Sequence, residues 1–242
     1  MRKWGFLILF TLPLLLSITA CSGQSGQTSA TGGTAAQGKS RLDTVKSRGK
    51  LICGVSGELP GFSFVDKEGN YKGLDVEVCR AIASAIFDNP DAVEFRNLNA
   101  KERFTALQTG EIDVLSRNTS WTISRDTSVG LEFAPVVFYD GQGIMVKKDS
   151  NIKTLADLKD KAICTQTGTT NEQNLADQMR KRGITYKPVV FEDINTAYAT
   201  YAEGRCQAVT SDRSQLLSRK TTLPQPQNHV ILNEVLSKEP LA

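Results

Sequence analysis

Apolar residues along this chain alternate between the spacing typical of strands and the spacing typical of helices. A short apolar run at 51–55 predicts a strand, and turn residues at 65–71 separate two extended pieces. The next apolar positions recur on one face of a helix, at Leu74, Val78, Ala81, Ile82, Ala85 and Ile86. A further strand is predicted at 112–115. This order predicts a βαβ unit whose largely parallel sheet is covered by helices.

One more helix is predicted ahead of the strand at 112–115. Asn99 followed by Glu102 at the third position resembles a capping box, which marks the start of a helix. Phe104 and Leu107 are expected to form its buried face, and Gly110 is expected to end it.

The second part of the chain repeats this scheme. Its expected elements are a short helix capped by Thr154 and Asp157, a strand at 162–165, a helix around Leu175 and Met179, a strand at 188–191, a helix from Asp193 to Gly204 that buries Ala197, Tyr198 and Tyr201, and a strand at 207–210. Segments 104–110 and 198–204 both run through a helix and a glycine into a strand, which places Asn118 opposite Asp212. Ligands of open α/β sheets bind beyond strand ends, so both residues are expected to line a cleft between two similar lobes.

The N-terminus carries the pattern of an export signal. Positive residues at 1–3 precede an apolar run at 4–16 and small residues that end at Cys21. The pattern resembles the lipobox of bacterial lipoproteins, in which this cysteine carries lipid; an ordinary signal with an incidental cysteine is the alternative. We expect a signal peptide at 1–20, a flexible tether at 21–40, and a lipid-anchored location in the periplasm or on the extracytoplasmic face of the membrane.

Four further cysteines lie in the body of the chain, and an exported protein keeps disulfides. They allow three connectivities. We favour Cys53 with Cys79 and Cys164 with Cys206, because each pair then lies within one predicted half. Four buried thiols or a metal site are the alternatives. The chain has no CxxC pair and a single histidine, His229, in a Pro/Gln-rich stretch where we expect it to be solvated, so no metal and no cofactor are predicted.

The charge balance argues against nucleic acid as a partner. The chain has 29 Lys and Arg against 26 Asp and Glu, a formal net charge of +3 at pH 7, and Arg2 and Lys3 belong to the predicted signal. Nucleic-acid-binding proteins need a larger basic excess.

Polar residues that follow the predicted strands suit a zwitterionic ligand. Segment 116–125 carries hydroxyls, an amide and two guanidiniums, and Arg125 offers a donor fork for a carboxylate. Segment 165–171 runs from a strand into a helix start, which binds anions through free N–H groups, although a plain turn of cap-forming residues has the same composition. Asp212 can hold an ammonium, or else cap a helix. Together with Ser120, these groups predict a site for an α-amino acid.

Four stretches of the chain carry specific motifs: LNAKERFTALQTGEIDVLSRNTSWTISRD at 98–126, YDGQGIMVKK at 139–148, CTQTGTTNEQNLAD at 164–177 and LSKEPLA at 236–242. They resemble the amino-acid-binding proteins of ATP-driven (ABC) importers, in particular the general L-amino-acid binders of periplasmic solute-binding protein family 3. The resemblance implies an α/β, two-lobed periplasmic-binding-protein fold of type II, in which each lobe is a mostly parallel sheet flanked by helices. It also implies a monomer that delivers its ligand to the permease subunits of an ABC transporter.

The resemblance further implies roles for single residues. By position, the expected ligand contacts are Ser120, Arg125, Thr170 and the neighbouring Thr169 for the α-carboxylate, Asp212 for the α-ammonium, and Asn118 and Arg117 nearer the ligand side chain. Narrow-specificity relatives place an aromatic ring over the ligand in the loop after the first strand. Here Leu59 or Phe62 is expected to cover the ligand instead, and without a fixed stacking platform we expect broad specificity.

The family pattern also predicts domain boundaries. Lobe 1 is expected at 41–140, the first hinge at 141–147, lobe 2 at 148–236, and the start of a second hinge at 237–242. The family chain returns through this second hinge to complete lobe 1. We therefore expect a C-terminally truncated chain with an incomplete lobe 1.

An exported enzyme resembling cyclohexadienyl or arogenate dehydratase is the main alternative, since such enzymes use the same two-lobed architecture. Catalysis would need a positioned acid or base in the cleft, and Glu58 is the obvious surplus carboxylate. No Ser/His/Asp or Cys/His constellation is visible. A sensor domain of a receptor or cell-wall enzyme is a third class. We expect a binding protein, not an enzyme.

Overall fold

The computed structural model describes residues 40–242. The predicted signal peptide at 1–20, Cys21 with its predicted lipid, and nearly all of the predicted tether at 21–40 lie outside the described residues. Among the residues that are described, no helix is long and apolar enough to cross a membrane.

The first half of the fold, defined here as α1 to α4, is built on a small parallel sheet. Its elements are α1 (Arg41–Arg48), β1 (Leu51–Val55), β2 (Glu58–Leu59), β3 (Ser63–Val65), β4 (Tyr71–Lys72), α2 (Leu74–Phe87), β5 (Val93–Asn97), α3 (Arg103–Thr109), β6 (Val114–Leu115) and α4 (Ile123–Ser128). Strand β1 lies between β5 and β6 and is parallel to both, while β2, β3 and β4 form a separate antiparallel sheet. The predicted strand at 51–55 and the existence of a helix from Leu74 are confirmed, whereas β6 is shorter than the predicted 112–115.

The predicted buried face of α2 was wrong: Ala81 and Ala85 are exposed, and the buried residues are Asp75, Val76, Cys79 and Ala83. The bond of Cys79 to Cys53 holds that other face against β1.

The second half, defined as β7 to β11, is built on a larger mixed sheet. Its elements are β7 (Phe138–Lys147), the 3-10 helices η1 (Lys148–Ser150) and η2 (Leu155–Leu158), β8 (Ala162–Gln166), α5 (Thr170–Lys181), β9 (Lys187–Phe191), α6 (Ile194–Ala202), β10 (Ala208–Asp212), α7 (Arg213–Lys220), η3 (Pro226–Asn228) and β11 (His229–Ile231). The strand order is β11-β7-β10-β8-β9. Strand β8 is parallel to β9 and β10, and β7 is antiparallel to its neighbours. A last strand, β12 (Lys238–Leu241), pairs antiparallel with β7.

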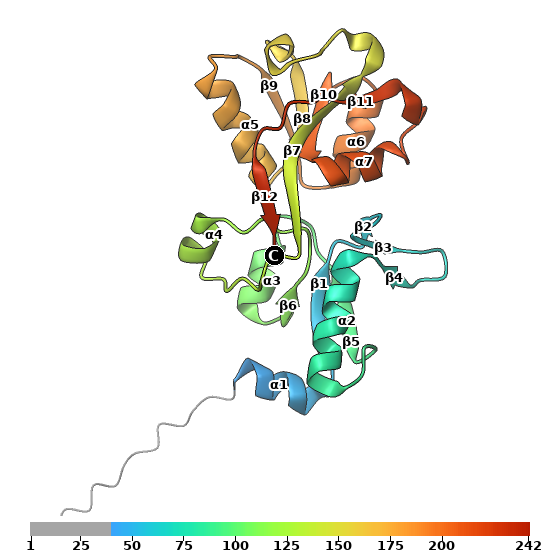
Figure 1. Ribbon diagram of the computed structural model, residues 1–242, viewed down its shortest axis with the longest axis vertical. Helices are drawn as coiled ribbons and strands as arrows, with labels where there is room; N and C mark the ends of the chain where they lie inside the picture. The colour runs from blue at the N-terminus through green and yellow to red at the C-terminus, as the bar shows by residue number, and fades with distance from the viewer. Residues whose placement is uncertain (1–39) are drawn as a thin grey trace, which may run out of the picture. The chain divides into compact units, whose positions relative to one another are not determined.

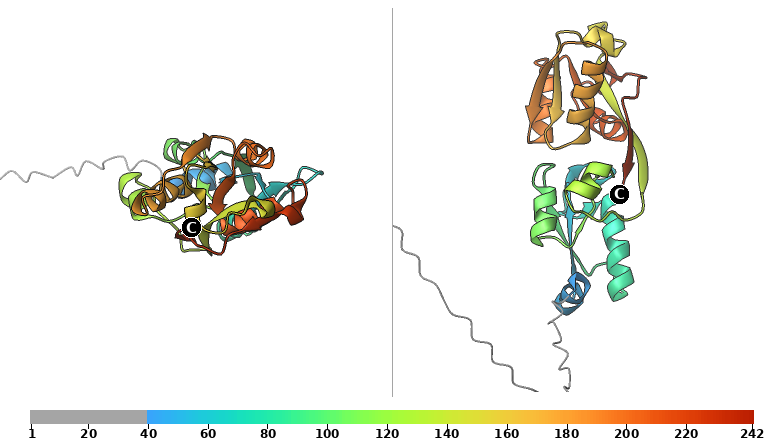
Figure 2. Two further views of the ribbon diagram at one scale, coloured as in Figure 1. Left: turned by 90° about the horizontal axis from the view of Figure 1, so that it is seen from above. Right: turned by 90° about the vertical axis from the view of Figure 1, so that its left-hand side faces the viewer.

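Strand β7 links the two halves. Its residues 142–147 pair with β10 and β11, whereas residues 138–141 pair with β12. Figures 1 and 2 show β7 and β12 side by side between the halves. The end of β12 is bonded to the first half, where the N–H of Trp121 donates to the carbonyl of Pro240 at 2.7 Å. The two strands therefore bring the segment that follows β6 close to the end of β10.

Helix α3 ends where the sequence predicts, but it begins at Arg103, after the predicted capping box, whose two hydrogen bonds close the turn ahead of the helix. The side-chain oxygen of Asn99 accepts a hydrogen bond from the N–H of Glu102 at 3.0 Å, and the Glu102 carboxylate accepts one from the N–H of Asn99 at 2.7 Å. Gly110 ends the helix with φ of 78°, a conformation that favours glycine.

The buried face of α3 differs from the prediction. Arg103 and Ala106 are its buried residues, whereas Phe104 and Leu107 are only half-buried. The Arg103 guanidinium turns inward because it donates to the carbonyl of Arg117 at 3.3 Å, an interaction that apolar spacing alone does not reveal.

The second half has larger clusters of buried apolar residues than the first. Successive residues of β7, β8 and β10 enter two clusters alternately, as the period of two in a strand requires. One cluster includes Ile144, Ile163, Ala208, Leu175 and Met179, and the other includes Met145, Cys164, Val209, Tyr201 and Leu216. In the first half, the clusters around β1 each contain three buried residues.

Each half carries one disulfide. Cys53 of β1 is bonded to Cys79 of α2, and Cys164 of β8 is bonded to Cys206 just before β10. These are the favoured pairs, so the alternatives of free thiols and other connectivities are set aside.

His229 is buried, so the prediction of a solvated histidine was wrong. Its Nδ1 lies 2.9 Å from the hydroxyl of Tyr201, and its Nε2 lies 3.0 Å from the carbonyl of Pro224. The Pro/Gln-rich stretch turns back onto α6, and the ring fills the space beside Tyr201.

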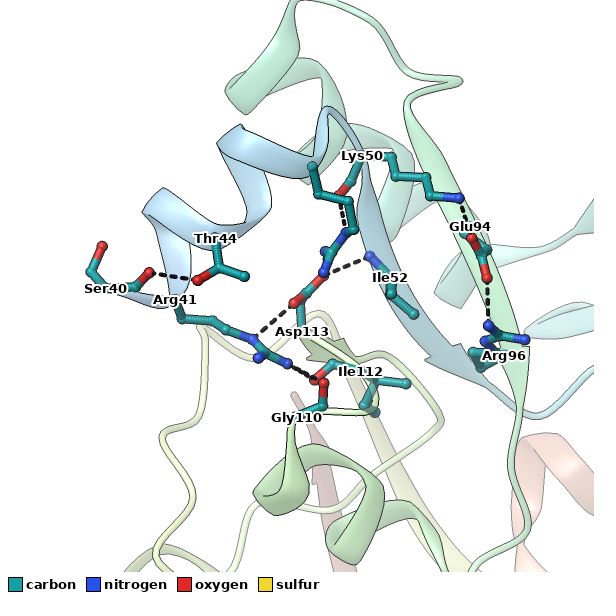
Figure 3. Close-up of polar contacts among 11 residues, drawn as sticks. Ser40, Arg41, Thr44, Lys50, Ile52, Glu94, Arg96, Gly110, Ile112 and Asp113 are labelled. Carbon is teal, nitrogen blue, oxygen red and sulfur yellow. Dashed lines mark hydrogen bonds and ion pairs between the residues drawn. The ribbon is translucent and has the colours of Figure 1, made fainter. Parts of the chain in front are cut away.

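Helix α1 is fixed to the first half by ion pairs (Figure 3). The buried carboxylate of Asp113 pairs with Arg48 and with Arg41, whose Nε lies 2.8 Å away. Asp113 also accepts a hydrogen bond from the N–H of Ile52 at 2.7 Å, which ties the loop before β6 to β1. This anchoring fixes the start of β6, the strand after which the candidate site begins.

Candidate functional site

A polar pocket lies between the segment after β6 and the starts of α5 and α7. It is lined by Arg103, Arg117, Asn118, Ser120, Arg125, Gln166, Thr169, Thr170, Asn171, Asp212 and Gln215. All the residues that the sequence assigned to the ligand are in this set except Leu59 and Phe62. The two halves therefore contribute the predicted groups to one site.

The first half contributes positive charge. Arg103, Arg117 and Arg125 are all buried, and burial lowers the pKa of each guanidinium, to about 10 for Arg117. The Arg125 Nη1 donates to the carbonyl of Ser120 at 2.8 Å, and its guanidinium lies 5.1 Å from the centre of the Phe104 ring. An anion bound here would relieve the mutual repulsion of three desolvated cations.

Asn118 contributes an acceptor to the pocket. Its backbone has φ of 33°, in the left-handed region that asparagine tolerates better than most residues. The N–H of Asn118 points at the buried carboxyl of Asp75 at 3.5 Å, while its own buried side-chain oxygen has no hydrogen-bond partner. A buried acceptor without a partner is costly, so this oxygen is suited to a donor on a ligand.

The second half contributes the negative group. Asp212 ends β10 and precedes α7, but its side chain makes no capping hydrogen bond, so the alternative of a simple helix cap does not hold. The carboxyl is buried and accepts a hydrogen bond from Asn171 Nδ2 at 2.9 Å. Burial raises the pKa of Asp212 to about 7, against the lowering effect of the Asn171 bond. A cation beside this carboxyl would favour its ionised form.

The start of α5 faces the same pocket. The Thr169 side chain caps the helix by accepting from the N–H of Glu172 at 3.2 Å, and Thr170 is the first helical residue. Gly168 has φ of 72°, and a Cβ there would lie 3.1 Å from the carbonyl of Ala100, so the turn needs a glycine to approach the first half. The N–H of Glu172 is taken by this cap, so the N–H groups of Thr170 and Asn171 are the ones in the first helical turn that are available to an anion.

Sequence reasoning missed Glu239. Its side chain is 2% exposed, and its carboxylate accepts hydrogen bonds from the hydroxyls of Ser120 and Thr170, the latter at 2.9 Å. The residue lies in the motif LSKEPLA, but its place beside the pocket depends on the pairing of β12 with β7. Arg103, Gln166, Asn171 and Gln215 were also missed.

Leu59 and Phe62, one of which was expected to cover the ligand, lie outside the lining of the polar pocket. Both pack with Leu241 and Leu74 in an apolar cluster. Pairing of β2 with β3 turns Leu59 into this cluster, where it is fully buried, and the Phe62 ring meets Phe138 edge to face at 5.6 Å. Neither residue lines the polar pocket.

A second cavity adjoins the first, because Arg117 and Gln166 line both. Its other lining residues include the carboxylates Glu58, Glu102, Glu192 and Asp193. Glu58 accepts a hydrogen bond from Asn195 Nδ2 at 3.0 Å, which joins the two halves across this cavity. The second cavity is thus lined by a cation, an amide and carboxylates, which could contact a part of a ligand that extends beyond the first pocket.

Comparison with known proteins agrees with this geometry. The model of the bacterial extracellular solute-binding proteins, family 3, matches residues 51–230. The general L-amino acid-binding periplasmic protein AapJ of Rhizobium johnstonii is 51% identical, over 86% of this chain and 61% of that protein. The glutamate/glutamine/aspartate/asparagine-binding protein BztA of Rhodobacter capsulatus is 47% identical, over 84% of this chain and 60% of that protein.

A solved structure shares the fold. It is an ABC transporter periplasmic binding protein from Brucella ovis with glutathione bound, 51% identical, with a TM-score of 0.81 over 84% of this chain and 64% of that chain. This chain spans about three-fifths of the length of the curated relatives it matches. The predicted two-lobed fold is confirmed, and the chain belongs to the bacterial extracellular solute-binding proteins of family 3.

Proposed function

We propose that this protein captures L-amino acids outside the cytoplasm, with broad specificity, and delivers them to the permease subunits of an ABC importer. One observation carries the proposal. A buried guanidinium, Arg125, and a buried carboxyl, Asp212, come from different halves of the fold and line the same pocket.

This pair of opposite charges fits the main-chain groups of a free amino acid. Arg125 offers a planar donor fork for the α-carboxylate, and Asp212 accepts from the α-ammonium. Each buried protein charge gains a partner when the zwitterion binds, which is the condition under which buried charges are tolerated.

The α-carboxylate needs further donors, and the structure limits which groups supply them. A hydroxyl has one proton, and those of Ser120 and Thr170 are donated to Glu239. The remaining donors are the Arg125 guanidinium and the free N–H groups at the start of α5. Ser120 and Thr170 therefore belong to the site through their backbone and their oxygen lone pairs.

Broad specificity follows from the neighbouring cavity. It places the cation of Arg117 and the carboxylate of Glu58 within reach of one ligand side chain, together with the amide of Gln166. Leu59 and Phe62 are committed to the apolar cluster and provide no stacking platform. Side chains of different charge can thus find a partner, in line with the general binding of amino acids that the name of AapJ describes.

The arrangement of the chain supports closure of two lobes on the ligand. We assign lobe 1 to 41–140, the first hinge to 141–147, lobe 2 to 148–236 and the start of a second hinge to 237–242. Arg125 in lobe 1 binds first, and lobe 2 closes when Asp212 engages. The protein acts as a monomer, with a signal peptide at 1–20, and is anchored to the membrane through lipid on Cys21, which keeps it near its permease.

A binding role fits the site better than catalysis. Glu58, the surplus carboxylate, is bonded to Asn195, and His229 is bonded to Tyr201 away from the pocket. Neither is positioned as a free acid or base at the polar pocket, so we propose that the protein is not an enzyme.

Titration calorimetry with a panel of L-amino acids tests the function. Neutral, acidic and basic L-amino acids should all bind, whereas N-acetylated and α-amidated forms, which lack one main-chain charge, should lose at least tenfold in affinity. Binding of a single amino acid would contradict broad specificity. Turnover of a cyclic carboxylate such as prephenate without amino-acid binding would instead support the enzyme.

A further inference from the structure

Glu239 is the centre of a buried hydrogen-bond network beside the ligand pocket. Its carboxylate accepts from Ser120 Oγ, from Thr170 Oγ1 at 2.9 Å, from Asn174 Nδ2 at 2.8 Å and from Ser237 Oγ. With four donors, the acceptor capacity of a buried carboxylate is largely satisfied. This matters because a desolvated carboxylate without partners would be strongly destabilising.

The donors to Glu239 come from three parts of the fold. Ser120 follows β6 in the first half, and Thr170 and Asn174 belong to α5 in the second half. Ser237 directly precedes β12, the strand that contains Glu239. The hydroxyls of Ser120 and Thr170 lie 3.3 Å from each other and donate to the same carboxylate oxygen. One atom of Glu239 therefore joins the two faces of the pocket.

We propose that Glu239 is a positioning residue that latches the two lobes together at the ligand. From its place on β12, it orients the hydroxyls of Ser120 and Thr170. It thereby holds the segment that follows β6 against the start of α5. The latch forms where both lobes meet, as they do in this structure, so it stabilises the closed form both without and with a ligand. The effect on ligand binding rests on the proposed function, whereas the joining of the lobes does not.

The substitution Glu239→Gln removes the charge while keeping the size of the side chain. An amide has one oxygen acceptor and one NH₂ donor in place of two carboxylate oxygens, so it cannot accept from all four present donors. Because the latch acts after closure, its loss should increase the rate of ligand dissociation and leave the association rate nearly unchanged.

The first test measures both rates by stopped-flow fluorescence, using an amino acid that the wild-type protein binds. For Glu239→Gln we expect a dissociation rate at least tenfold faster and an association rate within threefold of wild type. The matched control is Glu234→Gln, because Glu234 lies in the same stretch but bonds to Leu155 and Arg182 outside the pocket. Its rates should stay at the wild-type values. An unchanged dissociation rate, or tighter binding, in Glu239→Gln would overturn the proposal.

The second test needs no ligand. Hydrogen exchange of the ligand-free protein, followed by mass spectrometry, should be at least threefold faster in Glu239→Gln in both segments 116–122 and 168–175. Faster exchange confined to 237–241 would show a local role and overturn the latch. If the wild-type protein binds no amino acid, the proposed function fails, and the exchange experiment alone decides on the latch.

A second variant covers the case in which Glu239→Gln does not fold. Glu239→Asp keeps the buried charge, but its carboxylate is one methylene farther from Ser120 and Thr170. The same faster dissociation and exchange are expected, and wild-type behaviour of this variant, with Glu239→Gln unfolded, would overturn the latch.

Discussion

The helix–strand units that end at β6 and β10 are built alike, but the side chains that they contribute to the polar pocket carry opposite charge. In each half a helix, α3 or α6, leads through a glycine in the left-handed region, Gly110 or Gly204, to the strand. Beyond β6 the chain places Arg117 and Arg125 in the pocket, and at the end of β10 it places Asp212. The repeated backbone thus provides two equivalent strand ends, and under the proposed function the side chains there divide the recognition of a zwitterion between them.

The largest expected effect comes from removing the charge of the second half. Asp212→Asn keeps the shape and the possibility of bonding to Asn171 but removes the partner of the α-ammonium. Loss of one member of a buried charge pair costs about 2–5 kcal/mol, so the affinity should fall by roughly thirtyfold to several thousandfold. Calorimetry with the best-bound amino acid measures this, and unchanged affinity would reject the assignment of Asp212.

Stability distinguishes lost binding from lost folding in Asp212→Asn. Burial raises the folded-state pKa of Asp212 to about 7, so its stabilising contribution is present below about pH 4 and is lost as the pH rises through 7. At pH 8 the neutral asparagine should therefore increase the thermal unfolding midpoint of the ligand-free protein. Asp157→Asn, which alters an exposed helix cap in the same half, is the control that should leave affinity unchanged.

The pH dependence of affinity also tests the role of the Asp212 carboxyl, and its expected effect is smaller than that of Asp212→Asn. The α-ammonium binds the ionised form of Asp212, and a pKa of about 7 means that only about a tenth of the carboxyls are ionised at pH 6. Affinity should therefore be about tenfold weaker at pH 6 than at pH 8.5, while Arg125 stays charged throughout. Asp212→Asn should abolish this dependence. A dependence that persists in the variant would assign it to another group, such as Asp75, whose pKa burial raises to about 6.

The sequence was informative where local chemistry determines the structure. The helix that begins at Leu74, the hydrogen-bonded pair of Asn99 and Glu102, the cap at Asp193 and the strand-end position of Asp212 depend on neighbouring residues, and the structure has all of them. The sequence also predicted both disulfides, because each bond was expected to lie within one half: Cys53 with Cys79, and Cys164 with Cys206.

The sequence was uninformative where contacts between distant segments determine the position of a side chain. Glu239 enters the site only because β12 pairs with β7, and Leu59 leaves it only because β2 pairs with β3. Arg103 occupies a buried helix position that apolar spacing assigns to solvent, since its partner carbonyl at Arg117 lies beyond the next strand. Such contacts depend on the tertiary fold, which residue spacing does not specify.

The smallest expected effect on binding comes from the disulfides, although their effect on stability is large. Replacing Cys53 and Cys79, or Cys164 and Cys206, by alanine opens loops with sequence separations of 26 and 42 residues. In the chain-entropy model each bond contributes roughly 3–4 kcal/mol, and the two differ by only about 0.4 kcal/mol. Both variants should therefore unfold at clearly lower temperature, as calorimetric scans would measure.

Neither disulfide crosses from one half to the other, and neither involves β7 or β12, so the closure of the pocket should not depend on them. Below both unfolding midpoints, the affinity of each double variant should stay within about threefold of wild type. The two variants should differ in one respect. The core around β1 contains fewer buried apolar residues than the core around β8, so it has less packing to hold β1 and α2 together once the Cys53–Cys79 bond is removed. A tenfold loss of affinity in the Cys53 and Cys79 variant alone would mean that the first half must be rigid to present Arg125, and the two strand ends would then no longer be equivalent supports.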